Sequence, residues 1–132
     1  MNDPITKADE RASFEAYNAI AATLQRYIDG ARTGDGALMR AAFLETAHIR
    51  GIYGGQGVDW ALSDFCALID KHGPAADMVA QIVTLDVSGT AAAARLEAEN
   101  WRGTRYSDFF VLLRVDAGWR IASKVFFAHS RA

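Results

Sequence analysis

Three side chains in this sequence of 132 residues combine chemical reactivity with apolar surroundings. His48 lies in a short segment of alternating polarity, and its imidazole exchanges protons near neutral pH. Asp108 and Lys124 lie in apolar stretches, where burial shifts the pKa of each group unless the two pair. The pattern therefore predicts either a structural ion pair between Asp108 and Lys124 or a site with acid–base or lysine chemistry.

Aromatic residues could form a pocket around these groups. Tyr27 lies on an apolar stripe, where its hydroxyl either points into a cavity or is satisfied inside the core. Three further aromatic residues lie near the expected edges and suit a hydrophobic pocket mouth or a dimer contact: Tyr53, Trp60 and Trp101. We expect a pocket for a small apolar or aromatic molecule, bordered by Tyr27, His48, Tyr53, Trp101, Asp108 and Lys124.

The spacing of histidine and cysteine predicts no metal site. His48, His72 and His129 share no metal-ligand spacing with one another or with Cys66, and we expect no cofactor. Cys66 is the only cysteine, so no intramolecular disulfide can form. It is interpreted as a small apolar residue rather than a nucleophile.

Composition limits the class of partner. The formal net charge is −2 and no cluster of Lys and Arg offsets it, so we expect neither nucleic acid nor an anionic membrane as a partner. No apolar run approaches the roughly 20 residues needed to span a bilayer. Residues 1–10 lack the pattern of a signal peptide. A cytoplasmic protein with a single domain over residues 1–132 is expected.

The elements that would position these residues begin with helices. Apolar residues spaced by threes and fours predict a helix over about residues 8–33. Its stripe comprises Phe14, Tyr17, Ile20, Ala21, Leu24, Tyr27, Ile28 and Ala31. A shorter helix is expected after Asp35, and a third from its N-cap Ser63 to residues 73–74. Between these helices, residues 47–53 alternate as a strand and residues 54–57 form a turn or loop.

Residues 79–87 and 90–102 predict two antiparallel strands around a turn at Ser88 and Gly89. Pairing Val87 with Thr90 separates apolar from polar side chains. The apolar face comprises Val79, Val83, Leu85, Ala92, Ala94, Leu96 and Ala98. The opposite face carries Glu97 and Glu99, which are interpreted as solvated residues paired with nearby arginines.

Residues 106–127 predict a second hairpin, with its turn at residues 116–118 and Val115 opposite Trp119. One face then holds Phe109, Val111, Leu113, Val115, Trp119, Ile121, Val125 and Phe127. The other holds Tyr106, Asp108, Phe110, Leu112, Lys124 and Phe126. Both faces are apolar, so we expect helices to cover one of them. A second subunit is expected to cover the other, in a homodimer formed through Phe110, Leu112 and Phe126.

The register between the two hairpins decides the neighbour of Asp108. Pairing Arg102 with Tyr106 places Asp108 opposite Asn100. A slip of one residue places it opposite Glu99 instead. Since like charges directly opposed destabilise a sheet, we expect the register that opposes Asp108 to Asn100.

Helices followed by antiparallel strands define an α+β chain. This order, together with residues 27–35, 106–121 and 124–126, resembles the nuclear-transport-factor-2-like (NTF2-like) superfamily, which includes ketosteroid isomerases and SnoaL-like polyketide cyclases. The amino-acid sequence of the terminal segment is most similar to that of the branch described as putative lumazine-binding. The resemblance implies a cone-like curved antiparallel sheet wrapped by the N-terminal helices, with cystatin-like topology, an internal pocket and frequent dimerisation through the sheet.

The resemblance also implies roles for particular residues. Tyr27 matches by position the tyrosine that helps form the oxyanion hole of the isomerases. Their general-base aspartate would fall near residues 50–51, where this chain has no carboxylate. The leading hypothesis is a small-molecule pocket. Two alternatives are an isomerase or cyclase with His48 or Asp108 as base, and a ligand-free dimerisation module whose cavity is filled by its own side chains.

Overall fold

The structure is a computed structural model that describes residues 6–116 and 118–129. Helices α1 (Lys7–Thr33) and α2 (Gly36–Arg40) lead into strands β1 (Phe43–Tyr53) and β2 (Gln56–Ala61). Helix α3 (Leu62–His72) then precedes four long strands. These are β3 (Val79–Ser88), β4 (Ala91–Trp101), β5 (Thr104–Val115) and β6 (Gly118–Ala128). The element order confirms the expected α+β class.

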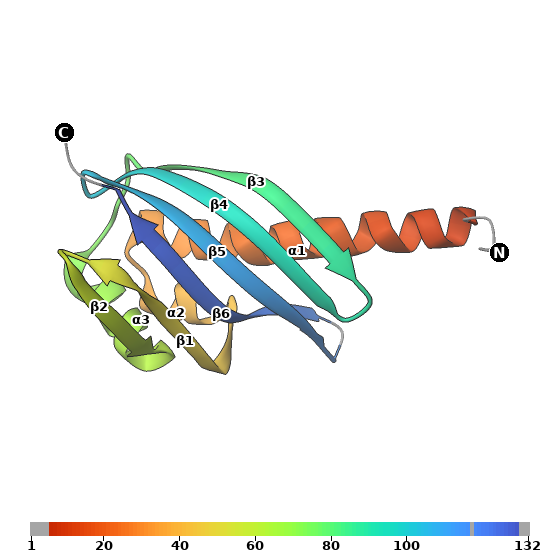
Figure 1. The fold of residues 1–132 in the computed structure, drawn as a ribbon, viewed down its shortest axis with the longest axis horizontal. Coiled ribbons are helices and arrows are strands. Elements are labelled where there is room, and N and C mark those ends of the chain that lie inside the picture. The colour runs from red at the N-terminus through yellow and green to blue at the C-terminus, as the bar shows by residue number, and fades with distance from the viewer. Residues whose placement is uncertain (1–5, 117, 130–132) are drawn as a thin grey trace.

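The strands form a six-stranded sheet in the order β2-β1-β6-β5-β4-β3. Neighbouring strands are antiparallel except for β1 and β6, which pair in parallel. The ladder is interrupted by bulges in β1–β6, β3–β4, β4–β5 and β5–β6. Because bulges bend and twist strands, they account for the curvature of the sheet. Figure 1 shows α1 crossing one face of the sheet, with α2 and α3 at the end formed by β1 and β2.

Helix α1 packs on the sheet through the second half of its apolar stripe. Ile20, Leu24 and Tyr27 are fully buried, as the spacing predicted. Phe14 and Tyr17 are exposed instead, so their expected inward position is wrong. The cause is visible in Figure 1, where the first turns of α1 extend past the edge of the sheet and have nothing to pack against.

The β1–β2 hairpin was not predicted in full. Residues 54–57 were expected to be a turn or loop, but only Gly54 and Gly55 make the turn, with φ of 60° and 80°. Such positive φ values at both positions are the geometry that glycine permits. Gln56 pairs with Tyr53 and opens β2, a strand whose glycine and aspartate gave no strand signal.

Helix α3 begins two residues earlier than expected. Its N-cap is Ala61, which makes no side-chain capping hydrogen bond, so the assignment of Ser63 as N-cap is wrong. The helix ends at Gly73 with φ of 76°, as the Gly-Pro pair predicted. Within the described residues, no helix combines the length and hydropathy that crossing a bilayer requires.

The β3–β4 turn lies one residue later than expected, because Ser88 pairs with Ala91. A bulge between Ile82 and Thr84 then reverses the first half of β3, so that Ile82 opposes the buried Leu96. Val79 and Val83, expected on the apolar face, are consequently exposed. The expected β4 face, Ala92, Ala94, Leu96 and Ala98, is buried as predicted.

The predicted strand pairing of the terminal hairpin is correct in the half that lies away from its turn. Phe110 pairs with Lys124 and Asp108 with Phe126, so these four side chains share a face as predicted. Near the turn, Val115 pairs with Gly118 rather than with Trp119, and a bulge follows Val111. Trp119 and Ile121 therefore lie buried on the same face as Leu112, opposite to the expectation. The expected turn includes Ala117, which lies outside the described residues.

Asp108 opposes neither Asn100 nor Glu99. Trp101 pairs with Thr104 across a tight turn, and a bulge separates this pair from Ala98 and Tyr106. The register that results places Asp108 opposite Leu96. Both expected registers are therefore wrong, because the turn lies earlier, at Arg102 and Gly103, and the bulge shifts the pairing by one more residue.

The sheet has two contrasting faces. The inner face, toward α1, buries Leu96, Asp108, Phe110, Leu112, Trp119, Ile121, Lys124 and Phe126. The outer face exposes Phe109, Val111, Leu113, Val125 and Phe127. The expected dimer contact through Phe110, Leu112 and Phe126 is wrong, since all three are buried within one chain. The alternation along β5 and β6 separated the faces, but it did not indicate which of them α1 covers.

Candidate functional site

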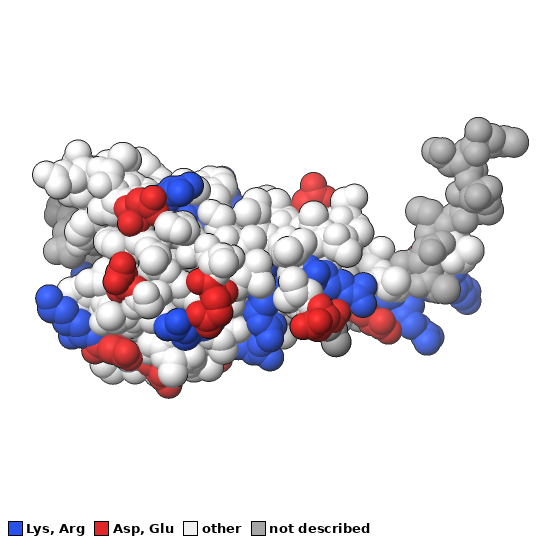
Figure 2. Space-filling view, turned by 90° about the horizontal axis from the view of Figure 1, so that it is seen from below, with Lys and Arg blue, Asp and Glu red and all other residues white. Residues whose placement is uncertain are grey.

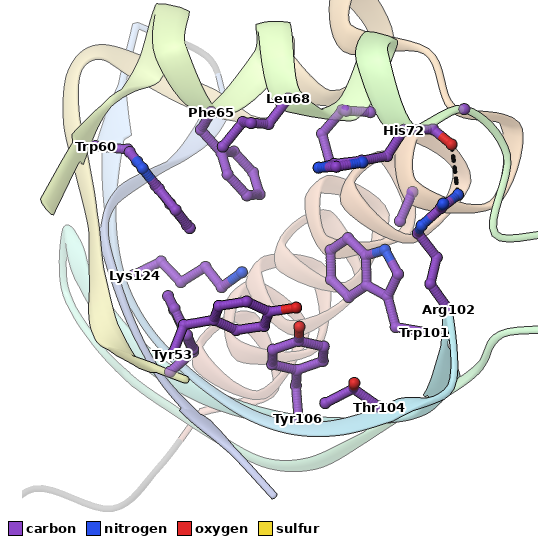
Figure 3. A pocket seen from close by; sticks show the side chains of 14 residues that line it. Tyr53, Trp60, Phe65, Leu68, His72, Trp101, Arg102, Thr104, Tyr106 and Lys124 are labelled. Carbon is purple, nitrogen blue, oxygen red and sulfur yellow. Dashed lines mark hydrogen bonds between the residues drawn. The ribbon is translucent and has the colours of Figure 1, made fainter. Parts of the chain in front are cut away.

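A cavity of about 570 Å³ lies between α3 and the inner face of the sheet (Figure 3). It is lined by Ala31, Tyr53, Trp60, Phe65, Leu68, Ile69, His72, Gly73, Trp101, Arg102, Thr104, Tyr106, Lys124 and Phe126. The lining is mainly aromatic and aliphatic, with few polar groups. Pockets of this size and composition are typical of small-molecule sites.

The position of Trp101 depends on an unusual turn. Asn100, Arg102 and Gly103 have φ of 59°, 55° and 87°, all in the left-handed region. Glycine and, to a lesser degree, asparagine tolerate this region, so the strain of the turn falls mainly on Arg102 at the rim of the cavity. The turn holds the indole of Trp101 edge-on to Tyr27, with ring centroids 5.9 Å apart. Figure 3 shows this indole directed into the same space as Lys124.

A second aromatic group forms the opposite wall. Trp60 stacks on Phe126 at 6.1 Å and on Phe65 at 6.2 Å between ring centroids. Gly51 allows this packing, because a Cβ atom there would lie 2.7 Å from the Phe126 ring. A residue with a side chain at this position would push the ring out of place.

Lys124 extends from β6 into the space between these walls (Figure 3). Its Nζ lies near four ring centroids, those of Phe65 at 4.8 Å, Tyr27 at 5.0 Å, Phe126 at 5.2 Å and Trp101 at 5.3 Å. Aromatic faces stabilise a cation at such distances. Only 3% of the residue is exposed, although it lines the cavity.

Asp108 lies behind Lys124 and completes a buried polar group with Tyr27. Its Oδ1 is 3.8 Å from Lys124 Nζ, within ion-pair range but beyond hydrogen-bond range. Its Oδ2 accepts a hydrogen bond from the Tyr27 hydroxyl at 2.7 Å. Asp108 and Tyr27 are fully buried, and neither lines the cavity. Of these three residues, Lys124 is the one that a bound molecule would meet.

Burial works against both charges of the pair. It raises the pKa of Asp108 and lowers the pKa of Lys124, while the attraction between the two groups opposes both shifts. Burial, followed by the Asp108 charge, also raises the pKa of Tyr27 well above its usual value. Tyr27 therefore remains a hydrogen-bond donor, and burial favours the transfer of a proton from the Lys124 ammonium to the Asp108 carboxylate.

Tyr53 and Tyr106 form a second polar patch on the lining. Burial, and then the neighbouring Tyr53, raises the pKa of Tyr106 to about 12. Figure 3 shows both rings extending into the cavity beside Lys124. Arg102 donates a hydrogen bond to the His72 carbonyl and ties the β4–β5 turn to the end of α3 at the rim.

Among the six residues predicted to border a pocket, the structure brings five together. Tyr53, Trp101 and Lys124 line the cavity, and Tyr27 and Asp108 contact Lys124 from behind. His48 does not join them: its side chain is half exposed, and Nδ1 lies 2.7 Å from Asp59 on β2. His48 follows the buried Ala47 on a strand, so alternation directs it outward.

Several lining residues were not among these six. Trp60, expected at a pocket mouth or a dimer contact, lines the cavity from the unexpected strand β2. Phe65 and Leu68, on the cavity side of α3, were given no pocket role. Phe126 and Tyr106 were assigned correctly to the face of Lys124, but without a ligand role. The signal available for them was that shared face, which carries a lysine among aromatic residues.

Charged side chains outside the cavity do not gather by sign on the face in Figure 2. Lys and Arg alternate there with Asp and Glu among the described residues. The described ranges also contain no group of three or more His, Cys, Asp or Glu side chains placed to hold a metal ion. Cys66 is buried, and its burial raises the pKa of the thiol.

Comparison with solved structures places the fold. An NTF2-like protein of unknown function from Methylobacillus flagellatus KT is 34% identical, with a TM-score of 0.83 covering 98% of this chain and 99% of that one. An NTF2-like protein with a cystatin-like fold from Novosphingobium aromaticivorans is 20% identical, with a TM-score of 0.73 covering 96% and 90%. The chain therefore has the NTF2-like, cystatin-like fold that the sequence predicted.

Comparison of sequences adds a relative and a family. The aldolase FrzH of a Cladobotryum species is 25% identical over 116 residues, which is 87% of this chain and 93% of that protein. A family model described as "Putative lumazine-binding" matches residues 15–127, a range that includes α3, the sheet and all cavity-lining residues. The chain thus belongs to the family described as "Putative lumazine-binding", within the NTF2-like superfamily.

Proposed function

We propose that this protein binds a small, planar, largely apolar molecule in the cavity and directs an oxygen of that molecule to Lys124. One observation carries the proposal: the Lys124 amine faces a cavity of about 570 Å³ from among four aromatic rings. The rings provide apolar contact area, and the amine provides a single directional polar contact. A flat ligand with a carbonyl or acidic oxygen satisfies both.

Lumazine shares the planar bicyclic shape and offers two carbonyl groups, although its ring nitrogens make it more polar than the cavity lining. Its rings would lie between the wall of Trp60 and Phe126 and the indole of Trp101, with one carbonyl accepting a hydrogen bond from Lys124. The family description supports lumazine as the first compound to test. The open cavity also favours a ligand over the alternative of a dimerisation module filled by its own side chains.

Tryptophan fluorescence tests the proposal, because Trp60 and Trp101 line the cavity whereas Trp119 is buried elsewhere. We expect saturable quenching by lumazine, after correction for its absorption, and by other planar aromatic ketones and acids. A variant with Trp60→Phe and Trp101→Phe retains Trp119 as an internal reference and should lose the quenching. Absence of saturation with every compound, confirmed by calorimetry, would overturn the proposal.

A second candidate function is enzymatic and concerns a carbonyl substrate. It is favoured by the buried Asp108–Lys124 pair at the cavity and by the similarity to an aldolase. The geometry assigns the proton-transfer role differently from the sequence, because His48 faces outward and Asp108 does not line the cavity. Lys124 is the group that could exchange a proton with the substrate, and Asp108 would act through it.

Hydrogen–deuterium exchange at the carbon next to a ketone tests this candidate. With 2-tetralone in heavy water, an acid–base site should accelerate the loss of the α-proton signal, and Lys124→Met should abolish the acceleration. If 2-tetralone binds but exchanges no faster than in buffer alone, the enzymatic candidate is contradicted and ligand binding remains the proposed function.

The outer face of the sheet supports a homodimer, although not through the residues first expected. Phe109, Val111 and Leu113 on β5 form one apolar surface with Val125 and Phe127 on β6. Exposed apolar surface of this extent on one sheet face marks an interface. We propose that a second copy of the chain covers it, leaving the cavity on the opposite face of each sheet accessible.

A further inference from the structure

We propose that Lys124 captures the carbonyl carbon of an aldehyde or ketone as a covalent Schiff base inside the cavity. The inference rests on the proposed function, because the carbonyl compound must first bind between the aromatic walls. It goes further by assigning Lys124 a bond-forming role rather than a hydrogen bond alone.

Placement separates Lys124 from the other lysines of the chain. Lys7 and Lys71 lie exposed on α1 and α3, where water solvates their amines. Lys124 is 3% exposed, and its amine borders the cavity with one carboxylate oxygen of Asp108 at 3.8 Å. A lysine amine in apolar surroundings gives up its proton more readily, and burial lowers the pKa of Lys124 accordingly.

The reaction balances within the group of Lys124 and Asp108. Lys124 Nζ first approaches Asp108 Oδ1 from 3.8 Å to hydrogen-bond distance, and the ammonium passes a proton to the carboxylate. The free amine then attacks the carbonyl carbon to form a C–N bond. The C=O electron pair moves to oxygen, which takes up the second nitrogen proton and becomes the hydroxyl of a carbinolamine. Asp108, which does not line the cavity, then returns its proton to the nitrogen, and the nitrogen passes a proton to the hydroxyl. The C–O bond breaks, water leaves, and the nitrogen lone pair forms the C=N bond. The products are a protonated imine and one molecule of water.

The charges before and after this sequence are the same. An ammonium beside a carboxylate becomes an iminium beside a carboxylate, at the same nitrogen atom. The four surrounding rings and Asp108 therefore stabilise the product cation as they stabilise the starting one. Tyr27, whose hydroxyl donates to Asp108 at 2.7 Å, fixes the carboxylate for both proton transfers.

The test uses 2-naphthaldehyde with sodium cyanoborohydride, which reduces an imine to a stable secondary amine. Intact-mass measurement should show a single addition, and peptide mapping should place it on Lys124 at least tenfold faster than on Lys71 or Lys7. Lys124→Arg keeps the positive charge but cannot form the imine, so it should lose the addition. Labelling spread over Lys7, Lys71 and the amino terminus, or unchanged in Lys124→Arg, would overturn the inference.

A non-carbonyl analogue separates this inference from the proposed function. 2-Naphthalenemethanol has the same ring system and should quench Trp60 and Trp101 without forming an adduct. If it quenches and the aldehyde leaves Lys124 unlabelled, binding stands and the covalent role fails. If neither compound quenches, both fail. Asp108→Asn should slow labelling at saturating 2-naphthaldehyde at least tenfold, because the Lys124 ammonium then has no carboxylate to accept its proton.

Discussion

The two faces of the sheet use similar residues for opposite purposes. Phe110 on the inner face is 2% exposed and packs edge-on against Tyr27, whereas its neighbour Phe109 is 48% exposed and lies under the Arg95 guanidinium. Charged groups differ in the same way. On the inner face, Lys124 and Asp108 form a buried ion pair, and aromatic rings surround the lysine. Glu97, in contrast, forms salt bridges with two arginines at the surface.

The difference shows that composition alone does not distinguish a binding face from an association face. Both faces of β5 and β6 are rich in aromatic and branched apolar residues. What separates them is the helix α1, which covers one face, and the buried ion pair that only that face contains. Each substitution below tests one half of this contrast.

The largest effect is expected at the neighbouring phenylalanines. Phe110→Ala leaves a cavity beneath α1 and should lower the free energy of unfolding by about 3–5 kcal/mol. Phe109→Ala, its matched control, should change the free energy of unfolding of the monomer by no more than about 1 kcal/mol. Urea denaturation, at concentrations where the protein is monomeric, measures both. Equal decreases in the free energy of unfolding for the two variants would contradict the difference in burial between the faces.

Removal of the buried amine comes next. In Lys124→Met, Asp108 loses its cation and takes up a proton, so the cost should be about 1–3 kcal/mol at neutral pH. The pKa of Asp108 is raised by burial, hence the folded state keeps this proton after the unfolded chain has lost it. Stability of the variant should therefore fall as the pH rises above about 4, the ordinary aspartate value.

Thermal denaturation across this pH range, with Lys71→Met as the exposed control, measures the effect. Adding Asp108→Asn to Lys124→Met should remove the pH dependence. Its persistence in the double variant would assign it to another group.

The outer face should control association. Val111→Lys places a charge in the centre of the exposed apolar surface and should weaken a dimer at least tenfold, or about 1.4 kcal/mol. Sedimentation velocity at micromolar concentrations measures this, with Ala67→Lys on the exposed side of α3 as control. A wild-type monomer at these concentrations would remove the dimer proposal.

The smallest effect is expected at Glu97. Burial works against its charge, but hydrogen bonds from Arg105, Ser107 and Arg95 outweigh this and lower its pKa to about 2. The folded state therefore loses this proton more readily than the unfolded chain, whose glutamate pKa is about 4.3. The stabilisation is complete above that value and disappears as the pH falls toward 2.

Glu97→Gln should therefore be less stable than the wild type at pH 6 and converge with it near pH 2. Acid titrations followed by circular dichroism measure the difference. A constant difference at every pH would show that the ionised carboxylate is not the cause.

The sequence could predict the fold class, the helix α1, the buried β4 face and the position of Asp108 and Lys124 on the same face of the sheet. These follow from periodicity over long segments, which short interruptions do not erase. Val79, Val83, Trp119 and Ile121 were assigned to the wrong face for one reason. A bulge adds a single residue to a strand, and alternation then continues with inverted parity.

The candidate site was predictable only in part, because its second wall comes from a strand that periodicity missed. Trp60 lies on β2, and Phe126 fits beside it only because residue 51 has no side chain. His48 was assigned to the pocket for its chemistry, and the alternation with the buried Ala47 and Ile49 was the better guide. Contacts between segments distant in sequence leave no local pattern from which to infer them.

The parallel pairing of β1 with β6 has a consequence for how the protein folds. β1 is made early and β6 after every other strand, yet Ile49 and Lys124 lie side by side in the finished sheet. Until β6 docks, β1 has only the short β2 as a neighbour in the sheet. The aromatic rings that surround Lys124 in the folded protein then lack its ammonium group. Such non-local pairing slows folding and leaves apolar strand edges open to aggregation. The strand that carries Lys124 is thus the one that completes the sheet.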